Sequence, residues 1–150
     1  NGTGGVTISG FTFPTTDGSS GQFIKTDGSG NLSFASAGAT LNHSDLADAT
    51  TTVASSATST LNTFDKTVYR SAKYFISIKD ATNSRFEIVE ANVTHDGSDA
   101  YVSTFGSTTN YTGGLCVFSA DVSGDDVRLR ITNISDASTV FKFQRIAVDV

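Results

Sequence analysis

Residues 70–79 read Arg-Ser-Ala-Lys-Tyr-Phe-Ile-Ser-Ile-Lys, and this run decides the fold of the larger part of the chain. The even positions from 72 to 78 are alanine, tyrosine and two isoleucines, whereas the odd positions are serines, lysines and one exception, Phe75. Alternation with a period of two is typical of a β-strand that is buried on one face. The run therefore predicts a half-buried strand with Phe75 on its polar face.

Similar runs occur before and after this one and are separated by turn signals, such as Asp96-Gly97 and residues 123–125. In the next run the alternation shifts phase between Ile88 and Val89, which predicts a bulge or burial on both faces. No long helical period competes with the strands. The sequence predicts an all-β fold, a jelly-roll-like antiparallel β-sandwich of about eight short strands. These strands are expected at residues 51–54, 58–64, 70–79, 85–95, 100–105, 115–120, 127–132 and 140–148.

The N-terminal segment is rich in Gly, Ser and Thr and has a different character. Within residues 13–34, the pattern Thr-Asp-Gly-Ser occurs at 16–19 and again at 26–29. Asp-Gly and Gly-Asn supply the positive φ angles of tight turns, so each copy predicts a reversal between short strands. The large apolar residues are too few to form a core, and the segment is expected to need partner chains. They are Phe11, Phe13, Phe23, Ile24, Leu32 and Phe34.

Three parts are expected along the chain. Residues 1–38 form an extended oligomerisation arm with repeated turns. Residues 39–50 form a polar connector, in which Asn42 or Ser44 could cap a helical turn. Residues 51–150 form the β-sandwich head.

The composition excludes several classes of protein. Only 17% of the 150 residues are charged and the net charge is −5, which argues against a nucleic-acid-binding protein with clustered Lys and Arg. No run of 18 apolar residues occurs, so membrane insertion is not expected, and no basic-then-apolar leader is present. The chain begins with Asn1, which suggests a processed or truncated start.

Residues that could carry chemistry are scattered. Cys116 lies alone in an apolar run and is expected to be a small buried hydrophobe. His43 and His95 have no spacing that demands a metal or a general base, and turn or cap roles are favoured for them. Two sets of acidic side chains offer oxygen ligands for Ca²⁺, but neither matches a known calcium loop. They are Asp121, Asp125 and Asp126, and Asp17, Asp27 and Asn31. We expect no catalytic residues, no metal and no cofactor.

Residues 13–34 resemble a linker common in tail and neck fibre proteins of tailed bacteriophages, cyanophages among them, with Phe34 in place of the usual Trp. Residues 69–76 and 95–101 are similar to a β-sandwich module that ends many such virion proteins. Together the two resemblances cover most of the chain. They imply a homotrimeric fibre or appendage without catalytic activity. It would lie on the virion, associate with itself and with other virion proteins, and take part in host attachment.

Five aromatic residues are candidates for exposure by strand parity or loop position: Tyr69, Phe75, Tyr101, Phe105 and Tyr111. They are candidates for binding a receptor such as a host surface glycan, or for filling a trimer interface, where aromatic residues are enriched. The interface is favoured. Two alternatives stay open, a carbohydrate-binding adhesin head and a subunit of an extracellular helical filament. A polysaccharide depolymerase is disfavoured because no obvious pair of catalytic carboxylates occurs.

Overall fold

The computed structural model describes residues 6–36 and 41–149. The chain divides into two compact units, Asn1–Thr40 and Leu41–Val150, which we call the arm and the head and describe separately. Within the described residues the regular structure is all β, and the sheets are antiparallel, so the predicted fold class is confirmed. No helix in these two ranges is long and apolar enough to cross a membrane.

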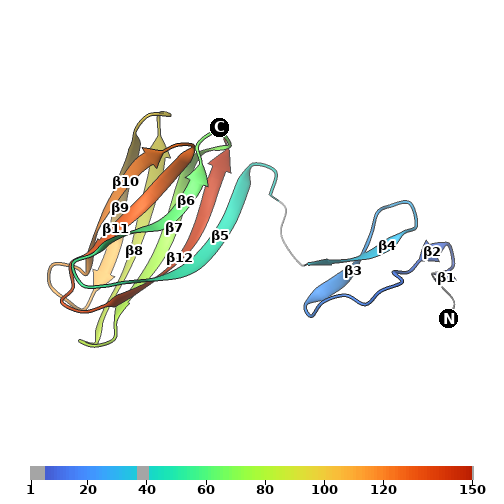
Figure 1. The fold of residues 1–150 in the computed structure, drawn as a ribbon, viewed down its shortest axis with the longest axis horizontal. Helices are drawn as coiled ribbons and strands as arrows, with labels where there is room; N and C mark the ends of the chain where they lie inside the picture. Colours follow the sequence, from blue (N-terminus) through green and yellow to red (C-terminus); the bar gives the residue numbers. More distant parts are fainter. Residues whose placement is uncertain (1–5, 37–40, 150) are drawn as a thin grey trace. The chain divides into compact units, whose positions relative to one another are not determined.

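Two small hairpins build the arm (Figure 1). Strand β1 (Thr7–Ile8) pairs with β2 (Phe11–Thr12), and β3 (Gln22–Thr26) pairs with β4 (Leu32–Ser36). The Thr12 amide donates to the Gly30 carbonyl at 2.8 Å and joins the hairpins. A Cβ on Gly30 would lie 2.7 Å from the Gly10 carbonyl oxygen, so this approach requires glycine.

The second Thr-Asp-Gly-Ser copy forms the reversal between β3 and β4. The Asp27 carboxylate accepts hydrogen bonds from the amides of Ser29, at 2.8 Å, and Asn31, at 3.1 Å, and from the Asn31 side chain, at 2.6 Å. These bonds lower the pKa of Asp27, and the bond from the Asn31 side chain contributes most. The first copy, at 16–19, does not reverse the chain between paired strands, so that part of the prediction is wrong. It lies in the loop from β2 to β3, where Gly18 packs against the ring of Phe34.

The arm has almost no interior of its own. None of residues 6–36 is buried. Ile8, Phe11, Phe23 and Ile24 each expose between 47% and 58% of their surface. Backbone hydrogen bonds and turn contacts therefore hold this unit, with little apolar burial.

The head is a sandwich of two sheets, seen as two layers of strands in Figure 1. The larger sheet has the order β5-β12-β7-β8-β9 and the smaller sheet the order β10-β11-β6. Strands β7, β8 and β9 form a meander in the larger sheet, and β10 and β11 form a hairpin in the smaller sheet. The remaining connections cross between the sheets, and the jelly-roll detail stays unconfirmed. The bounds are β5 (Ser44–Val53), β6 (Thr58–Asp65), β7 (Tyr69–Asp80), β8 (Arg85–His95), β9 (Ala100–Thr109), β10 (Cys116–Ser123), β11 (Asp126–Asn133) and β12 (Thr139–Asp149).

The alternating runs place the core between the two sheets. Tyr74, Ile76 and Ile78 of β7 are fully or almost fully buried, and Phe75 faces outward, as predicted. Across the sandwich they meet the inward side chains of β11, Val127, Leu129 and Ile131. The remaining buried apolar residues include Val53, Leu61, Phe64, Ala72, Val89, Ala91, Val93, Leu115, Phe141, Phe143 and Ala147.

The predicted connector is not a separate segment. Residues 44–50 belong to β5, which pairs with β12 from Ser44↔Val148 to Val53↔Thr139 and forms an edge of the larger sheet. No helical turn forms there, because this backbone is used in the β-ladder. Residues 39 and 40 of the predicted connector lie outside the described residues.

A buried arginine links both sheets at one end of the core. Arg145 of β12 is ion-paired with Asp45 of β5 and donates to Asn62 Oδ1 at 3.0 Å and to the Thr63 carbonyl at 2.8 Å in β6. The Tyr74 hydroxyl donates to the same Asn62 oxygen at 3.0 Å. Burial raises the pKa of Tyr74 to about 12, so this hydroxyl stays a neutral donor. The polar groups thus tie β5, β6, β7 and β12 together.

Candidate functional site

The larger sheet presents an unusually apolar surface on the side away from the core. Across its middle, β-ladder partners form two rows, Leu46-Ile146-Lys73-Asn92-Ser103 and Asp48-Gln144-Phe75-Glu90-Phe105. Together with Val148, Tyr101 and Phe86, which share this side, we call these residues the outer face. Its seven large apolar side chains each expose between 40% and 55% of their surface: Leu46, Phe75, Phe86, Tyr101, Phe105, Ile146 and Val148.

One ion pair occupies the middle of the outer face. Lys73 Nζ lies 2.6 Å from Glu90 Oε2 and 5.4 Å from the centre of the Phe105 ring. The lysine is therefore held by a carboxylate and by the face of an aromatic ring, a cation–π geometry. The central charges neutralise each other within one copy of the chain.

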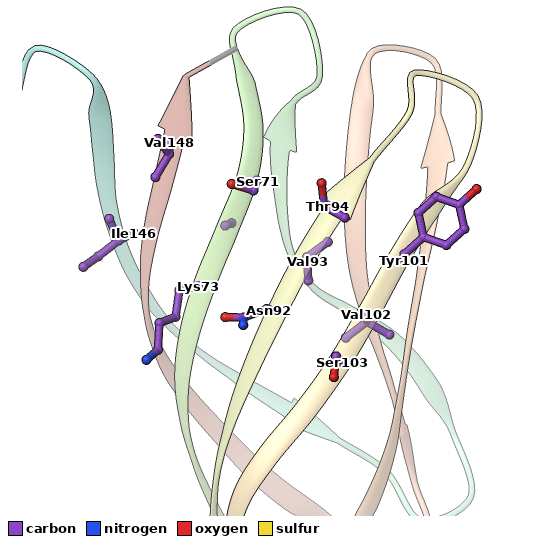
Figure 2. A pocket seen from close by; sticks show the side chains of 11 residues that line it. Ser71, Lys73, Asn92, Val93, Thr94, Tyr101, Val102, Ser103, Ile146 and Val148 are labelled. Carbon is purple, nitrogen blue, oxygen red and sulfur yellow. The ribbon is translucent and has the colours of Figure 1, made fainter.

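A depression of about 580 Å³ lies on this face. Its polar lining includes Ser71, Asn92, Thr94 and Ser103, as Figure 2 shows. Ile146 and Val148 of β12 bound it on one side and Tyr101 of β9 on the other. A second hollow of about 420 Å³ lies over β5, β12 and β7 and is lined by Leu46, Phe75 and Ile146 among others.

Three of the five predicted aromatic residues come together on the outer face: Phe75, Tyr101 and Phe105. Tyr69 packs against the core instead. Near the start of β7, Asp149 pairs with Tyr69 while Val148 pairs with Ser71, so Arg70 is an extra residue, and this bulge changes the side to which Tyr69 belongs.

Tyr111 lies in the loop after β9, away from the other aromatic residues of the predicted set. The Arg85 guanidinium stacks 4.0 Å from the centre of its ring. Whether these five residues bind a receptor or a second copy stays a prediction.

A tight turn fixes Tyr101 at the rim of the depression. Its hydroxyl donates to Asp96 Oδ2 at 3.0 Å, and Asp96 Oδ1 accepts from the amides of Ser98 and Asp99. The amides of Asp99 and Ser98 contribute most to holding the pKa of Asp96 at about 2. The hydrogen bond to this carboxylate raises the pKa of Tyr101. The ring is thus positioned by a charged turn, with its hydroxyl already bonded.

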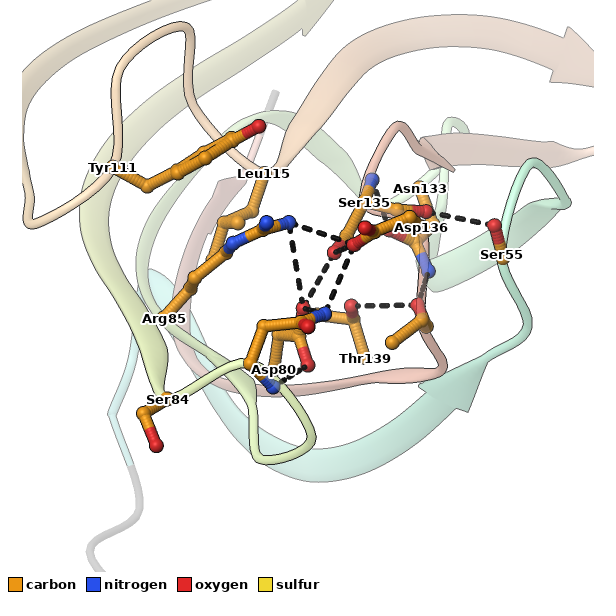
Figure 3. A network of polar contacts seen from close by, with 12 residues as sticks. Ser55, Asp80, Ser84, Arg85, Tyr111, Leu115, Asn133, Ser135, Asp136 and Thr139 are labelled. Atoms are coloured by element: carbon orange, nitrogen blue, oxygen red, sulfur yellow. Dashed lines mark hydrogen bonds and ion pairs between the residues drawn. The ribbon is translucent and has the colours of Figure 1, made fainter.

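A second cluster of polar groups surrounds Asp80, the last residue of β7 (Figure 3). Asp80 is fully buried and accepts from Ser135 Oγ at 2.6 Å and from the amide and side chain of Asn83 at 3.0 and 2.8 Å. Arg85 Nη1 pairs with Asp136 at 2.7 Å and lies 3.9 Å from Asp80. Because Asp80 is enclosed and its hydrogen-bonding capacity is used, we assign this network a structural role.

Asp80 should make stability depend on acid pH. The hydrogen bonds from Ser135 and then Asn83 lower its pKa to about 2, below about 3.9 in an unfolded chain. A lowered pKa contributes stability that is present above pH ~4 and is lost as pH falls toward ~2. We expect Asp80→Asn to be less stable at pH 7 and to show a shallower decline of the urea midpoint between these pH values. Asp99→Asn, at an exposed position, is the control, and an unchanged slope in Asp80→Asn would contradict the assignment.

The other candidate residues have structural partners. His43 Nδ1 lies 2.9 Å from Asp149 Oδ2, and His95 Nε2 donates to the Tyr69 carbonyl at 2.8 Å. Burial raises the pKa of the half-buried Cys116 to about 12, which disfavours a reactive thiolate. Asp121 accepts from Arg128 Nε and Nη2 at 2.6 and 2.8 Å. Among the described residues no group of three or more His, Cys, Asp or Glu side chains is arranged to hold a metal ion.

Three aliphatic residues of the outer face were not among the sequence candidates: Leu46, Ile146 and Val148. The signal for Ile146 and Val148 was present, because they share a parity opposite to Phe141 and Phe143. The alternation alone did not show which of the two sets of residues faces the core. Leu46 fell within the predicted connector, so no strand parity was assigned to it.

Comparisons with known proteins found similarity only at the level of structure. No protein-family model and no curated protein matches the sequence. The tailspike protein of Acinetobacter baumannii phage AM24 has a TM-score of 0.47 and 12% identity over 71% of this chain and 26% of its own. The tailspike protein of Acinetobacter phage vB_ApiP_P1 has a TM-score of 0.38 and 16% identity over 74% and 22%. The tailspike gp49 of Acinetobacter baumannii bacteriophage Fri1 has a TM-score of 0.36 and 18% identity over 71% and 18%.

The chain spans about a quarter or less of the length of these tailspikes. All three matched proteins are phage tailspikes, and none of them bears on the cyanophage and neck-fibre details of the expectation. One expectation is contradicted, that the protein is not an enzyme. The Fri1 tailspike is described as a capsular polysaccharide depolymerase, so resemblance to this class of phage protein does not imply absence of catalysis.

Proposed function

We propose that the chain is a subunit of a phage tail appendage, in which three copies associate through their arms and the assembly takes part in host attachment. The arm carries this proposal. Residues 6–36 form defined hairpins although none of them is buried. Covering half-exposed Phe and Ile side chains with further copies removes apolar surface from water, which lowers the free energy of the assembly.

The geometry of the arm suits pairing between chains. Its hairpins are two-stranded, so each has free backbone edges, and isolated two-stranded hairpins are marginally stable in water. The phage-linker resemblance of residues 13–34 covers β3, the turn after it and the first three residues of β4. Other virion proteins and a host surface glycan are the proposed partners of the assembled appendage.

The assembly is tested by sedimentation of the full chain. We expect a trimer, and we expect Phe23→Ser combined with Ile24→Ser to weaken association at least tenfold, which is about 1.4 kcal/mol. Both side chains are about half exposed in the single copy, so their loss should cost association more than folding. Val117→Ser on the exposed side of β10 is the matched control and should leave the trimer intact.

Other outcomes of the same experiment would count against the proposal. A full chain that sediments as a monomer at tens of micromolar would contradict the role of the arm. A mass that grows without limit as concentration rises would favour the open helical filament, because only a closed ring has a fixed number of copies.

The attachment half of the proposal needs a separate measurement. The trimeric full chain should bind at least one polysaccharide on an array of bacterial surface glycans. Absence of binding to every glycan would contradict attachment through sugars and leave the assembly unaffected.

A further inference from the structure

The two exposed surfaces of the head differ sharply in chemistry. The outer face carries seven large apolar side chains that are 40–55% exposed. On the opposite sheet, the outward positions of β10 and β11 include Ser119, Asp121, Arg128 and Thr132, with Val117 as the exposed large apolar residue. A sheet face that stays in water is normally polar. The smaller sheet has such a face, whereas the outer face has the character of a surface that becomes covered.

The size of the apolar patch fits a protein interface. Seven large side chains, each about half exposed, present roughly 600 Å² of apolar surface if each contributes about 90 Å². The largest patch on an ordinary monomer is about 300–600 Å². One partner of a standard interface contributes about 800 Å², of which about 60% is apolar. The outer face therefore holds about as much apolar area as one side of a stable interface requires.

The charges on this face permit its burial. Lys73 and Glu90 pair at 2.6 Å, and Lys73 also lies over the Phe105 ring. Covering them leaves no unpaired charge at the centre, which is the costly outcome for a buried ion. Asp48 and Lys142, on β5 and β12, lie toward one edge, and Lys79 lies beside Phe86 near the end of β7. These charges are outside the centre of the face, where interfaces are usually polar.

The position of the face relative to the arm in sequence points to the occupant. Leu46 belongs to β5, the first strand of the head, and β5 begins at Ser44, a few residues after the arm ends at Thr40. Arms that associate would therefore hold several heads within a short tether of one another. Such tethering gives an effective concentration in the millimolar range, which favours contact between copies over contact with any dilute protein.

The face also has two different halves. Leu46, Ile146 and Val148 lie on β5 and β12, whereas Phe86, Tyr101 and Phe105 lie on β8 and β9. In a closed ring of three, each copy contacts one neighbour through one patch and the other neighbour through a different patch. The depression of about 580 Å³ beside Ile146 and Val148 offers room for an aromatic side chain.

We propose that the outer face is the contact between heads, with the aromatic half of one copy packed on the aliphatic half of the next copy. This inference rests on the proposed trimer and adds the surface through which the heads meet. It makes the outer face an assembly surface, so a receptor would be bound elsewhere on the appendage.

Tryptophan fluorescence of the full chain tests the inference, because the chain contains no tryptophan. Phe75→Trp places an indole at the centre of the outer face, and Val117→Trp places the matched control on the opposite sheet. In the trimer we expect acrylamide to quench the indole of Phe75→Trp at least threefold less than that of Val117→Trp. Phe105→Trp repeats the measurement on the aromatic half in case the first substitution disturbs packing.

Adding a charge distinguishes burial by a second copy from other causes. Ile146→Lys in the Phe75→Trp chain should restore quenching to the level of the control, whereas Val117→Lys should not. A trimer in which the indoles of both Phe75→Trp and Phe105→Trp are freely quenched overturns the inference and leaves the proposed function intact. A protected indole in a monomeric chain also overturns it, because the same chain then covers the face. A monomer with exposed indoles contradicts both proposals.

Discussion

Asn133→Ala should lower the free energy of unfolding by about 3–4 kcal/mol, among the largest effects expected of a single substitution in this chain. Asn133 is fully buried. Its Nδ2 donates to the carbonyls of Val53, Ala54 and Ala137 at 3.0, 3.1 and 2.9 Å, and its Oδ1 accepts from the Ser135 amide at 2.9 Å. Truncation removes a partner from four backbone groups, and two of these contacts, to the Val53 carbonyl and from the Ser135 amide, are buried. Each buried group that is left unsatisfied costs about 1–3 kcal/mol.

The measurement is urea unfolding of the full chain at fixed protein concentration, since association would shift the apparent stability. Asn133→Asp keeps the shape but replaces the donor by an acceptor, so it should be at least as destabilising as alanine. Asn42→Ala, at an exposed position, is the matched control and should change stability by less than about 0.5 kcal/mol. An Asn133→Ala chain that loses less than about 1 kcal/mol would show that the loop rearranges to satisfy itself.

Phe141→Ala should destabilise the head by about 3–5 kcal/mol through the cavity that it creates. Phe141 is fully buried in β12, between β5 and β7 of the larger sheet. Strands on both sides fix the backbone at this position, so the surrounding side chains have little freedom to collapse into the vacated space. The same urea experiment measures the effect.

Phe141→Leu retains most of the apolar volume and should lose about 1–1.5 kcal/mol. The ratio between the two variants distinguishes a cavity effect from a general disturbance of β12. Similar losses in both would contradict the assignment of Phe141 to a tightly packed core.

Seven of the eight head strands could be predicted from the sequence, by strong alternation in the clearest runs and by the turn signals that separate the others. In residues 70–79 each inward side chain is large except Ala72, and in β11 the sequence Val-Arg-Leu-Arg-Ile repeats the same contrast. The core can then be predicted, because the apolar residues at every second position must face the interior. The eighth strand, β5, was predicted only at its C-terminal end, because its inward residues Ala47, Ala49 and Thr51 are small and give no contrast.

The outer face could be predicted only in part. The alternation of residues in β12 did not decide whether Ile146 and Val148 or Phe141 and Phe143 point inward, because both sets are apolar. Tyr69 was misplaced because the extra residue at Arg70 changes the parity, and such a bulge leaves no mark in the local sequence. The meeting of Phe75 with Tyr101 and Phe105 depends on the register of β7, β8 and β9, which involves residues far apart in the chain.

The phase shift near Ile88 illustrates the same limit. The predicted bulge exists, but it lies in β9, where Ile88 pairs with Thr108 and Glu90 with Phe105. Strand β8 itself alternates without interruption, with Glu87 as an inward residue. Glu87 is accommodated because it accepts hydrogen bonds from the Leu115 amide at 2.7 Å and Ser107 Oγ at 2.9 Å. A buried glutamate with dedicated partners cannot be recognised from hydrophobic periodicity.

The first and last strands of the head lie side by side with their outer ends together. Ser44 pairs with Val148, the Asp149 amide donates to the His43 carbonyl at 3.2 Å, and the side chains of His43 and Asp149 meet at 2.9 Å. A domain whose ends are this close can be inserted into a loop of another protein, or circularly permuted, without stretching its sheets. The head thus has the geometry of a domain that recombination can transfer from one protein to another, with its core and its outer face unchanged.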